Sequence, residues 1–317
     1  MSDIVTLTMN PAIDTYLAGD TLRTSKIRCT TTGAGPGGGG VNVVRVIRRL
    51  GGIAQAALTV GGPCGQRLLG MLDERDVPHH DIWVEGETRD TYVIFERESK
   101  RRYHIIIEGP RLHEAEWRAA LDLVGELSRP GLYLVLSGSL PPGVPDDFYA
   151  QAAAIAKERG CRVAVDTSGP PLAAALAEGV WLAKPNRNEL ETLAGHETPT
   201  FEERREVAER LVREGAAEVM AATFGPEGSL VVTAAECWHA QAPPIQPRSE
   251  VGAGDSFLGA LVLAITQGWD LSDAAAYAVA AAGSALSKSG PGLSGREQTE
   301  GLYEEIKARE GVRLLVS

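Results

Sequence analysis

Short apolar segments rich in β-branched residues alternate along the chain with segments whose apolar residues recur at helical spacing. The strand-like segments are Ile4–Thr8, Ala54–Val60, Leu132–Ser137, Arg162–Asp166, Val180–Lys184 and Glu218–Thr223. The helical segments include Val41–Leu50, Gln66–Asp76, Asp146–Arg159 and Glu202–Glu214. Strands separated by helices predict right-handed βαβ crossovers and a mostly parallel sheet covered on both faces. We therefore expect one α/β domain over residues 1–317, built as a three-layer α/β/α sandwich.

Two segments, 14–32 and 90–107, break this rhythm because polar and apolar residues alternate in them without a helix. The run Glu98-Ser-Lys-Arg resembles a hairpin turn. We expect the two segments to form a small β-sheet that projects from the domain as a lid. A two-faced sheet of this kind would expose apolar surface in a monomer. Pairing with the same face of a second chain predicts a homodimer.

Composition and charge exclude some classes of function. The 317 residues carry a net charge of −11, which argues against a nucleic-acid-binding surface. The apolar runs are too short or too interrupted by glycine to span a membrane. The four cysteines are far apart, and the N-terminus reads as a strand without the basic region of a secretion signal. We therefore expect reduced thiols and a cytoplasmic protein.

The run Glu250-Val-Gly-Ala-Gly-Asp-Ser-Phe257 precedes an apolar, alanine-rich segment that predicts a buried helix. The amides of Gly252, Ala253 and Gly254 can converge at the start of that helix, where the helix dipole favours anions. Asp255 places a carboxylate beside this anion site. Such a carboxylate fits a base that removes a hydroxyl proton while the amides stabilise a transferring phosphoryl group. Taken alone, a glycine-rich helix start favours a helix cap with a capping Asp, and it is the other motifs that reverse this preference.

Three further clusters contain polar groups or glycines at the ends of predicted elements. In Gly35-Pro-Gly-Gly-Gly-Gly40, glycines allow a polar ligand to approach the backbone, and Asn42 follows in the first helical turn. A flexible loop is the alternative interpretation. The segment from Ser137 to Gly143 follows a strand, where open parallel sheets bind ligands. In Lys184-Pro-Asn-Arg-Asn-Glu189, Asn186 and Glu189 lie one helical turn apart, and Glu189 can support a hydrated Mg²⁺.

These four clusters, in this order, resemble the PfkB, or ribokinase-like, family of carbohydrate kinases, and the resemblance spans nearly the whole chain. Within the family the chain is similar to the phosphosugar branch, which comprises 6-phosphofructokinases of the PfkB type, 1-phosphofructokinases and tagatose-6-phosphate kinases. The motif at 36–42, in which four glycines follow Pro36 and precede Val41 and Asn42, resembles the first of these most closely, whereas Asn10-Pro-Ala-Ile-Asp14 is closer to the other two. His104 stands where the 6-phosphofructokinases carry an arginine, so a phosphate contact there is left open.

The resemblance implies a substrate site. Asp14 would accept hydrogen bonds from sugar hydroxyls, with help from Asn42, Ser139 and the backbone of Gly38 and Gly39. Arg89 would grip the phosphate already on the sugar, because a guanidinium binds phosphate oxygens as a fork. Lys26 is a second phosphate ligand that would act across a dimer. Each of these two cations would otherwise be an ordinary solvated residue.

The resemblance also implies a nucleotide site, in which the triphosphate and its Mg²⁺ face Lys184, Asn186 and Glu189. The turn from Thr223 to Gly228 would line the adenosine pocket, although a plain hairpin turn explains that sequence equally well. The residues implied in nucleotide binding are Lys184, Asn186, Thr223, Gly225, Gly228 and Ser284. The backbone positions implied around a K⁺ ion are Ser249, Val251, Ala285 and Gly290.

The expected reaction is ATP-dependent phosphorylation of a ketohexose phosphate, foremost of fructose 6-phosphate to fructose 1,6-bisphosphate. Tagatose 6-phosphate and fructose 1-phosphate are alternative substrates within the branch. An unphosphorylated sugar or nucleoside would leave Arg89 and Lys26 without a phosphate to bind. A non-enzymatic sugar- or nucleotide-binding regulator is possible on the same fold, but it would not need the carboxylate of Asp255.

Overall fold

The structure, a computed structural model, describes residues 4–23, 26–247, 251–287 and 292–315. Its strands are β1 (Ile4–Thr8), β2 (Ala12–Gly19), β3 (Cys29–Gly37), β4 (Ala54–Val60), β5 (His79–Trp83), β6 (Arg89–Glu96), β7 (Arg102–Ile106), β8 (Tyr133–Ser137), β9 (Arg162–Asp166), β10 (Val180–Ala183), β11 (Ala217–Thr223), β12 (Ser229–Val232), β13 (Cys237–Ala240) and β14 (Val312–Leu314). Its helices are α1 (Gly39–Arg49), α2 (Gly62–Asp73), α3 (Glu114–Leu127), α4 (Phe148–Glu158), α5 (Gly169–Glu178), α6 (Arg187–Ala194), α7 (Phe201–Arg213), α8 (Ala253–Thr266), α9 (Leu271–Leu286) and α10 (Arg296–Ala308), with one 3₁₀ turn, η1 (Gly225–Glu227).

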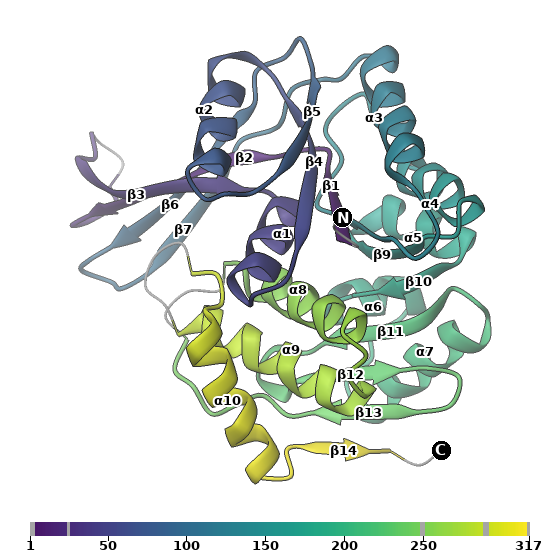
Figure 1. The fold of residues 1–317 in the computed structure, drawn as a ribbon. Coiled ribbons are helices and arrows are strands. Elements are labelled where there is room, and N and C mark those ends of the chain that lie inside the picture. The colour runs from purple at the N-terminus through teal and green to yellow at the C-terminus, as the bar shows by residue number, and fades with distance from the viewer. Residues whose placement is uncertain (1–3, 24–25, 248–250, 288–291, 316–317) are drawn as a thin grey trace.

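The described strands form one large sheet and one small sheet (Figure 1). The large sheet has the order β14-β13-β12-β11-β10-β9-β8-β1-β4-β5, and its strands from β11 to β5 are parallel. Strands β12, β13 and β14 complete one edge as an antiparallel meander. The predicted mostly parallel sheet is therefore confirmed.

Helices cover both faces of the large sheet, and each face has its own apolar core. One core joins the sheet to α1, α2, α8, α9 and α10, and the other joins it to α3, α4, α5, α6 and α7. Side chains alternate between the faces of each strand, so neighbours such as Ile4 and Val5 of β1 enter opposite cores. The predicted three-layer α/β/α sandwich is thus confirmed. Among the described residues, no helix combines the length and apolarity needed to cross a membrane.

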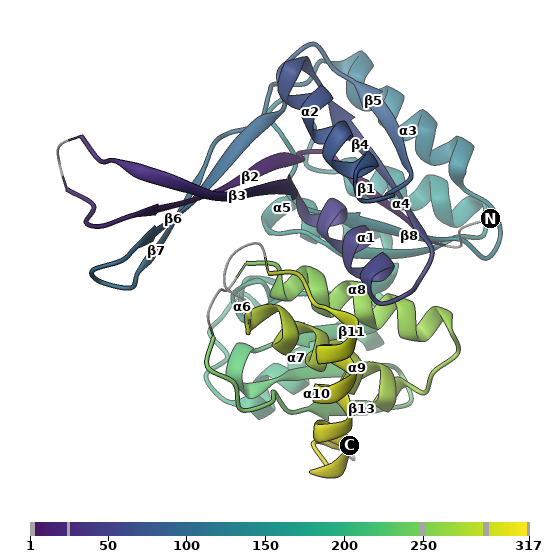
Figure 2. The same cartoon turned by 60° about the vertical axis from the view of Figure 1, so that its left-hand side comes forward.

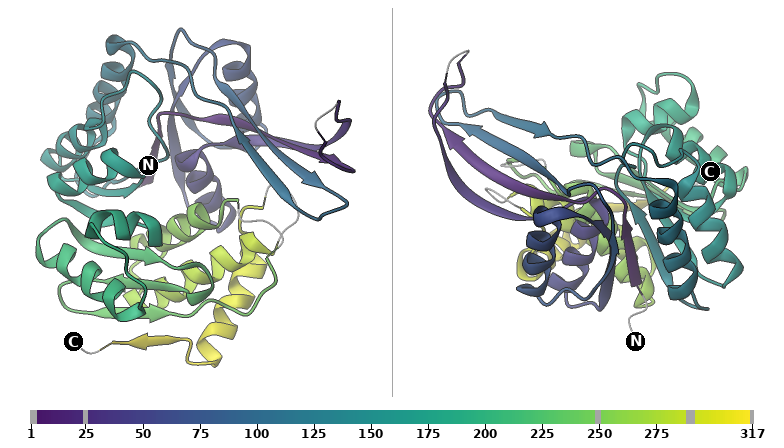
Figure 3. Two further views of the ribbon diagram at one scale, coloured as in Figure 1. Left: turned by 180° about the vertical axis from the view of Figure 1, so that it is seen from behind. Right: turned by 90° about the horizontal axis from the view of Figure 1, so that it is seen from above.

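The small sheet has the order β3-β2-β6-β7 and projects from one side of the large sheet (Figures 2 and 3). It confirms the second sheet expected from 14–32 and 90–107, with different limits. Residues 20–23 and 26–28, between β2 and β3, lie outside the sheet, and β3 continues to Gly37 because the glycine-rich end of that strand pairs with the start of β2. The turn predicted for Glu98-Ser-Lys-Arg is present between β6 and β7, with Lys100 at a φ of 60°.

Candidate active site

The site lies where the order of the large sheet reverses. The chain runs from β1 outward to β4 and β5, then returns to β8 on the other side of β1. The carboxyl ends of strands on either side of such a reversal leave a crevice between their loops, and ligands bind there in open α/β sheets. Here the crevice receives the segment after β1, the end of β8 at Ser137 with Gly138 and Ser139 after it, and the N-termini of α1 and α8.

Asp255 lies in the first turn of α8, which begins after Gly252. Gly252 has a φ of 79°, a left-handed conformation that glycine adopts without strain, and no side chain caps the helix. The first amides of α8 are therefore directed toward the cleft as expected for an anion site. Burial raises the pKa of the Asp255 carboxyl to about 7, and the neighbouring charge of Asp166 adds to this increase. A carboxylate with this pKa can act as a general base near neutral pH.

Asn42 bonds the Asp255 carboxylate, and Arg45 orients Asn42. Asn42 donates from Nδ2 to Oδ2 of Asp255 at 2.9 Å, while its own Oδ1 accepts from Nη1 of Arg45 at 3.1 Å. Arg45 is buried and also donates to the backbone oxygen of Pro36. Burial lowers the pKa of Arg45 to about 10, so its guanidinium remains charged at neutral pH. The cation thus orients the Asn42 amide with its donor toward the base.

The glycine run brings backbone and carboxylate close together. Of the glycine turn expected before the first helix, only Gly38 lies between β3 and α1, and it has a φ of 106°. A Cβ at Gly37 would lie 2.3 Å from Oδ2 of Asp14, and one at Gly39 would lie 2.5 Å from Oγ of Ser137. The glycines are therefore explained by the close approach of Asp14 and of the turn after β8, rather than by a flexible loop.

Asp14 extends from β2 into the same crevice. Its Oδ1 accepts from Oγ1 of Thr91 at 2.5 Å, and burial raises the pKa of the carboxyl. Asp14, Asn42 and Arg45 line one small pocket. The structure therefore brings together the two side chains predicted to bind sugar hydroxyls.

Arg89 and Ser139 line a second cleft of about 540 Å³. Arg89 donates from Nη1 to the backbone oxygen of Ile107 and from Nη2 to that of Asn10, both at 3.0 Å. Asn10 in turn donates from Nδ2 to Oγ of Ser139 at 3.2 Å. The guanidinium is thus fixed on the substrate side of the crevice, where it can meet an anion.

Neither of the other two candidate phosphate ligands is among the residues lining this cleft. His104 is exposed on β7, opposite Val93, and its charge would lower the pKa of Asp14. Lys26 is exposed and lies between β2 and β3 in the sequence. Within one chain, Lys26 lines neither of the two pockets described on the substrate side.

A third cleft, of about 610 Å³, lies on the other side of the α8 N-terminus. Its walls are mostly apolar, as an adenine ring requires. Three predicted nucleotide residues, Thr223, Gly225 and Gly228, line it, and so do Ala253 and Gly254 of α8. The buried Ser284 is not among the lining residues, because its Oγ is bonded to the side chain of Gln298 at 3.3 Å and to the amide of Gly295 at 3.2 Å. Ala282 and Gly283 form that part of the wall instead.

Lys184 lies beside the N-terminus of α8. Its Nζ lies 3.0 Å from Oδ1 of Asp166 and would lie 3.5 Å from a Cβ at Gly254. Asp166, at the end of β9, is a functional candidate that the sequence reasoning missed, although its place at the end of a predicted strand was a signal. Its charge also raises the pKa of Glu189, for which burial is the main cause. Two carboxylates and a cation therefore face one region.

Asn186 and Glu189 form a capping box at the start of α6. The amide of Glu189 donates to Oδ1 of Asn186 at 3.0 Å, and the amide of Asn186 donates to Oε2 of Glu189 at 2.8 Å. No cluster of three or more metal-ligating side chains occurs among the described residues. Mg²⁺ needs only one or two carboxylates when substrate phosphates and water complete its coordination. The oxygen donors of Asp166 and Glu189 fit that requirement.

The four positions expected around K⁺ are only partly covered by the structure. Val251 directly precedes Gly252 and lines the pocket of Asp14, and Ala285 is buried in α9. Ser249 and Gly290 lie outside the described residues.

Comparison with known proteins identifies the family. The model of the pfkB family carbohydrate kinases matches residues 5–298. The chain therefore belongs to the pfkB family of carbohydrate kinases, and it is a phosphotransferase enzyme.

Its relatives include two phosphofructokinases of Escherichia coli. The chain is 35% identical over 305 residues to the ATP-dependent 6-phosphofructokinase isozyme 2, covering 96% of this chain and 98% of the relative. It is 30% identical over 310 residues to the 1-phosphofructokinase, covering 96% of this chain and 97% of the relative.

Solved structures of the Escherichia coli phosphofructokinase-2 are similar throughout. One in complex with potassium has a TM-score of 0.93, at 35% identity, and covers 97% of this chain and 100% of the solved chain. Another, in complex with fructose 6-phosphate, has a TM-score of 0.92 at 34% identity with the same coverage. A third, described as a tetrameric inhibited form, also has a TM-score of 0.92, at 35% identity with the same coverage.

Proposed function

We propose that this protein transfers the γ-phosphoryl group of ATP to fructose 6-phosphate and forms fructose 1,6-bisphosphate. The observation that carries the proposal is the position of Asp255. Its carboxylate stands at the N-terminus of α8, bonded to Asn42 on the sugar side, while Gly254 of the same helical turn lines the apolar cleft. A base between a sugar pocket and a nucleotide cleft fits phosphoryl transfer to a hydroxyl.

In this mechanism the substrate's free hydroxymethyl oxygen lies beside Asp255. The carboxylate takes the hydroxyl proton as the oxygen attacks the γ-phosphorus, and the bond from that phosphorus to the bridging oxygen breaks to release ADP. The amides of Gly252, Ala253 and Gly254 stabilise charge on the transferring group. Lys184, held by Asp166, contributes a cation to the same region. Asp166 and Glu189 would hold Mg²⁺, which neutralises charge on the nucleotide phosphates when bound.

The substrate side favours a phosphorylated sugar. Arg89 is fixed by two backbone oxygens in a cleft shared with Ser139. A fixed guanidinium beside a hydroxyl suits a phosphate, because the charge-assisted hydrogen bonds are strong and directional. Asp14 and Asn42 would contact the sugar hydroxyls, together with the backbone of Gly38 and Gly39.

A homodimer and K⁺ binding belong to the same proposal. Strand β7 and the residues after it expose Tyr103, Ile105, Ile106 and Ile107, with Ile106 71% exposed. Covering these side chains with a second small sheet would remove the apolar patch and let Lys26 of one subunit approach the partner's sugar phosphate. K⁺ would bind near Val251 and Ala285. All four cysteines are free thiols, as expected for work in the cytoplasm.

A substrate panel tests this proposal. ATP-dependent turnover would be measured with fructose 6-phosphate, fructose 1-phosphate, tagatose 6-phosphate, fructose and ribose. We expect the highest kcat/KM for fructose 6-phosphate, and a much lower value for both unphosphorylated sugars. Preference for fructose 1-phosphate or tagatose 6-phosphate would assign the enzyme one of the other two activities of the phosphosugar branch. Preference for free fructose or ribose would contradict the assigned role of Arg89, and failure to turn over any of them would favour a binding protein.

A further inference from the structure

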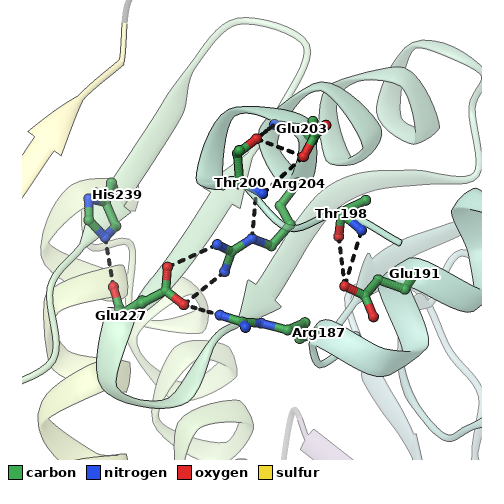
Figure 4. A network of polar contacts seen from close by, with 8 residues as sticks. All are labelled: Arg187, Glu191, Thr198, Thr200, Glu203, Arg204, Glu227 and His239. Carbon is green, nitrogen blue, oxygen red and sulfur yellow. Dashed lines mark hydrogen bonds and ion pairs between the residues drawn. The ribbon is translucent and has the colours of Figure 1, made fainter. Parts of the chain in front are cut away.

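One side of the nucleotide cleft is formed by a short turn, which backbone hydrogen bonds close between Phe224 and Gly228 and between Gly228 and Gly225. The 3₁₀ turn η1 and the residue after it line the cleft through Gly225, Pro226 and Gly228. Gly225 and Gly228 both have positive φ values, 58° and 90°, and their lack of side chains makes the turn intrinsically adaptable. Glu227 belongs to the same turn but is not among the lining residues. Its side chain is directed instead toward α6 and α7 (Figure 4).

Two arginines hold the carboxylate of Glu227. Arg204 donates from Nη1 to Oε1 at 3.1 Å and from Nη2 to Oε2 at 2.9 Å, which is a two-pronged arrangement. Arg187 forms an additional ion pair with Oε1 (Figure 4). The backbone oxygen of Glu227 also lies 2.8 Å from Nε2 of His239, on β13. The turn is thus fixed by its side chain and by its backbone.

Arg204 is itself firmly placed. Its side chain is only 3% exposed, and its Nε donates to the backbone oxygen of Thr200 at 3.0 Å. Its guanidinium carbon lies 4.8 Å from the ring centre of Phe224 and 5.8 Å from that of Phe201. A buried guanidinium between aromatic rings keeps one orientation, so it provides a rigid anchor for Glu227.

Arg187 connects the turn to the segment predicted to face the triphosphate. It follows Asn186 directly, at the first position of α6. Asn186 forms an isolated parallel bridge with Thr223, and the amide of Thr223 donates to the backbone oxygen of Pro185 at 3.0 Å. The ion pair of Arg187 with Glu227 therefore adds a second connection between the start of α6 and the segment that begins at Thr223.

We propose that Glu227, with Arg187 and Arg204, is a positioning residue for the nucleotide. This group, the Glu227 clamp, fixes the turn against α6 and α7 so that Gly225 and Gly228 meet the nucleotide in one geometry. It sets the affinity for ATP without touching ATP. The proposal rests on the use of the apolar cleft by ATP, as proposed above.

The test is the variant Glu227→Gln, which keeps the shape of the side chain and removes its charge. Because Glu227 is 43% exposed, the variant should fold. We expect the KM for ATP and the dissociation constant of ADP, measured by calorimetry, each to rise by about tenfold. The kcat and the KM for the sugar phosphate should stay within about twofold of wild type. Arg187→Ala, at a half-buried position, should raise the same two quantities by a smaller factor.

Glu209→Gln is the matched control, since Glu209 also pairs with two arginines. On α7, Glu209 lies 2.7 Å from Nε of Arg205 and 4.0 Å from Nη1 of Arg213, and it does not belong to a segment lining the nucleotide cleft. The KM of the Glu209→Gln variant for ATP should equal that of the wild-type protein. Equal increases in both Gln variants, or no increase with Glu227→Gln and Arg187→Ala, would overturn the clamp. A wild-type protein that fails to turn over ATP would instead overturn the proposed function.

Discussion

The pKa of Asp255 determines the pH at which the proposed base is available. Burial and the charge of Asp166 raise this pKa to about 7, whereas the hydrogen bond from Asn42 lowers it. A protonated carboxyl cannot accept the substrate's proton, so activity is lost as pH falls below the pKa. We therefore expect kcat/KM for the sugar phosphate to rise with pH and to level off above about 7.

Asn42→Ala separates this titration from that of the substrate's own phosphate. Loss of the Asn42 donor removes an interaction that favours the ionised carboxylate. The midpoint of the kcat/KM profile should therefore move to higher pH, although the absolute values should also fall. An unchanged midpoint would assign the titration to a group other than Asp255.

Arg89 is expected to recognise the phosphate that the substrate already carries. Its guanidinium lies in the cleft of Ser139, fixed by the backbone oxygens of Asn10 and Ile107. Arg89→Ala should raise the KM for the sugar phosphate by roughly tenfold or more, because hydrogen bonds to charged groups are lost. Steady-state kinetics should show a nearly constant KM for ATP. Equal increases in both KM values would indicate a general disturbance of the crevice.

At the scale of elements, the glycine-rich end of β3 permits the position of Asp14. A Cβ at Gly37 would lie within 2.3–2.5 Å of three atoms of the Asp14 carboxylate, so Gly37→Ala must displace that side chain. We expect a higher KM for the sugar phosphate and a small change in melting temperature, because the displaced group is the end of a side chain. Gly33→Ala, on the same strand with no atom within 4 Å, is the control and should behave as wild type in kinetics.

Most of the elements around the site could be predicted from the sequence. The strands before Asn10, Ser139 and Lys184 have continuous apolar runs, and the start of α8 has a recognisable glycine pattern. Strand β5 was missed because His79, His80 and Asp81 interrupt its apolar pattern. The short strands β12, β13 and β14 also give weak signals. The sequence suggested a glycine turn before α1, but pairing with β2 makes most of that run a strand.

Contacts between distant segments could not be predicted. Arg45 resembles a solvated helical residue in sequence, yet it is buried and orients Asn42 toward Asp255, more than two hundred positions away. Asp166 acquires its importance from Lys184, which directly follows the neighbouring strand β10. In both cases the decisive partner is set by strand order and helix packing, which local periodicity does not specify.

At the scale of the whole molecule, the exposed face of the small sheet predicts association. Wild type should sediment at about 67 kDa, twice the 33.6 kDa of one chain. Ile106→Asp should shift the protein toward the monomer and lower its activity, because a charge would be placed in the proposed interface. Ile53, 68% exposed but outside the small sheet, offers the control Ile53→Asp, which should remain dimeric. A fully active wild-type monomer would contradict the dimer.

The central claim is that Asp255 is the base for phosphoryl transfer from ATP to fructose 6-phosphate, and Asp255→Asn tests it most directly. The substitution keeps the size of the side chain and removes its ability to accept a proton. We predict that kcat with fructose 6-phosphate falls by at least about 10²-fold, while the dissociation constant of ATP changes far less. A kcat close to that of wild type would contradict the account.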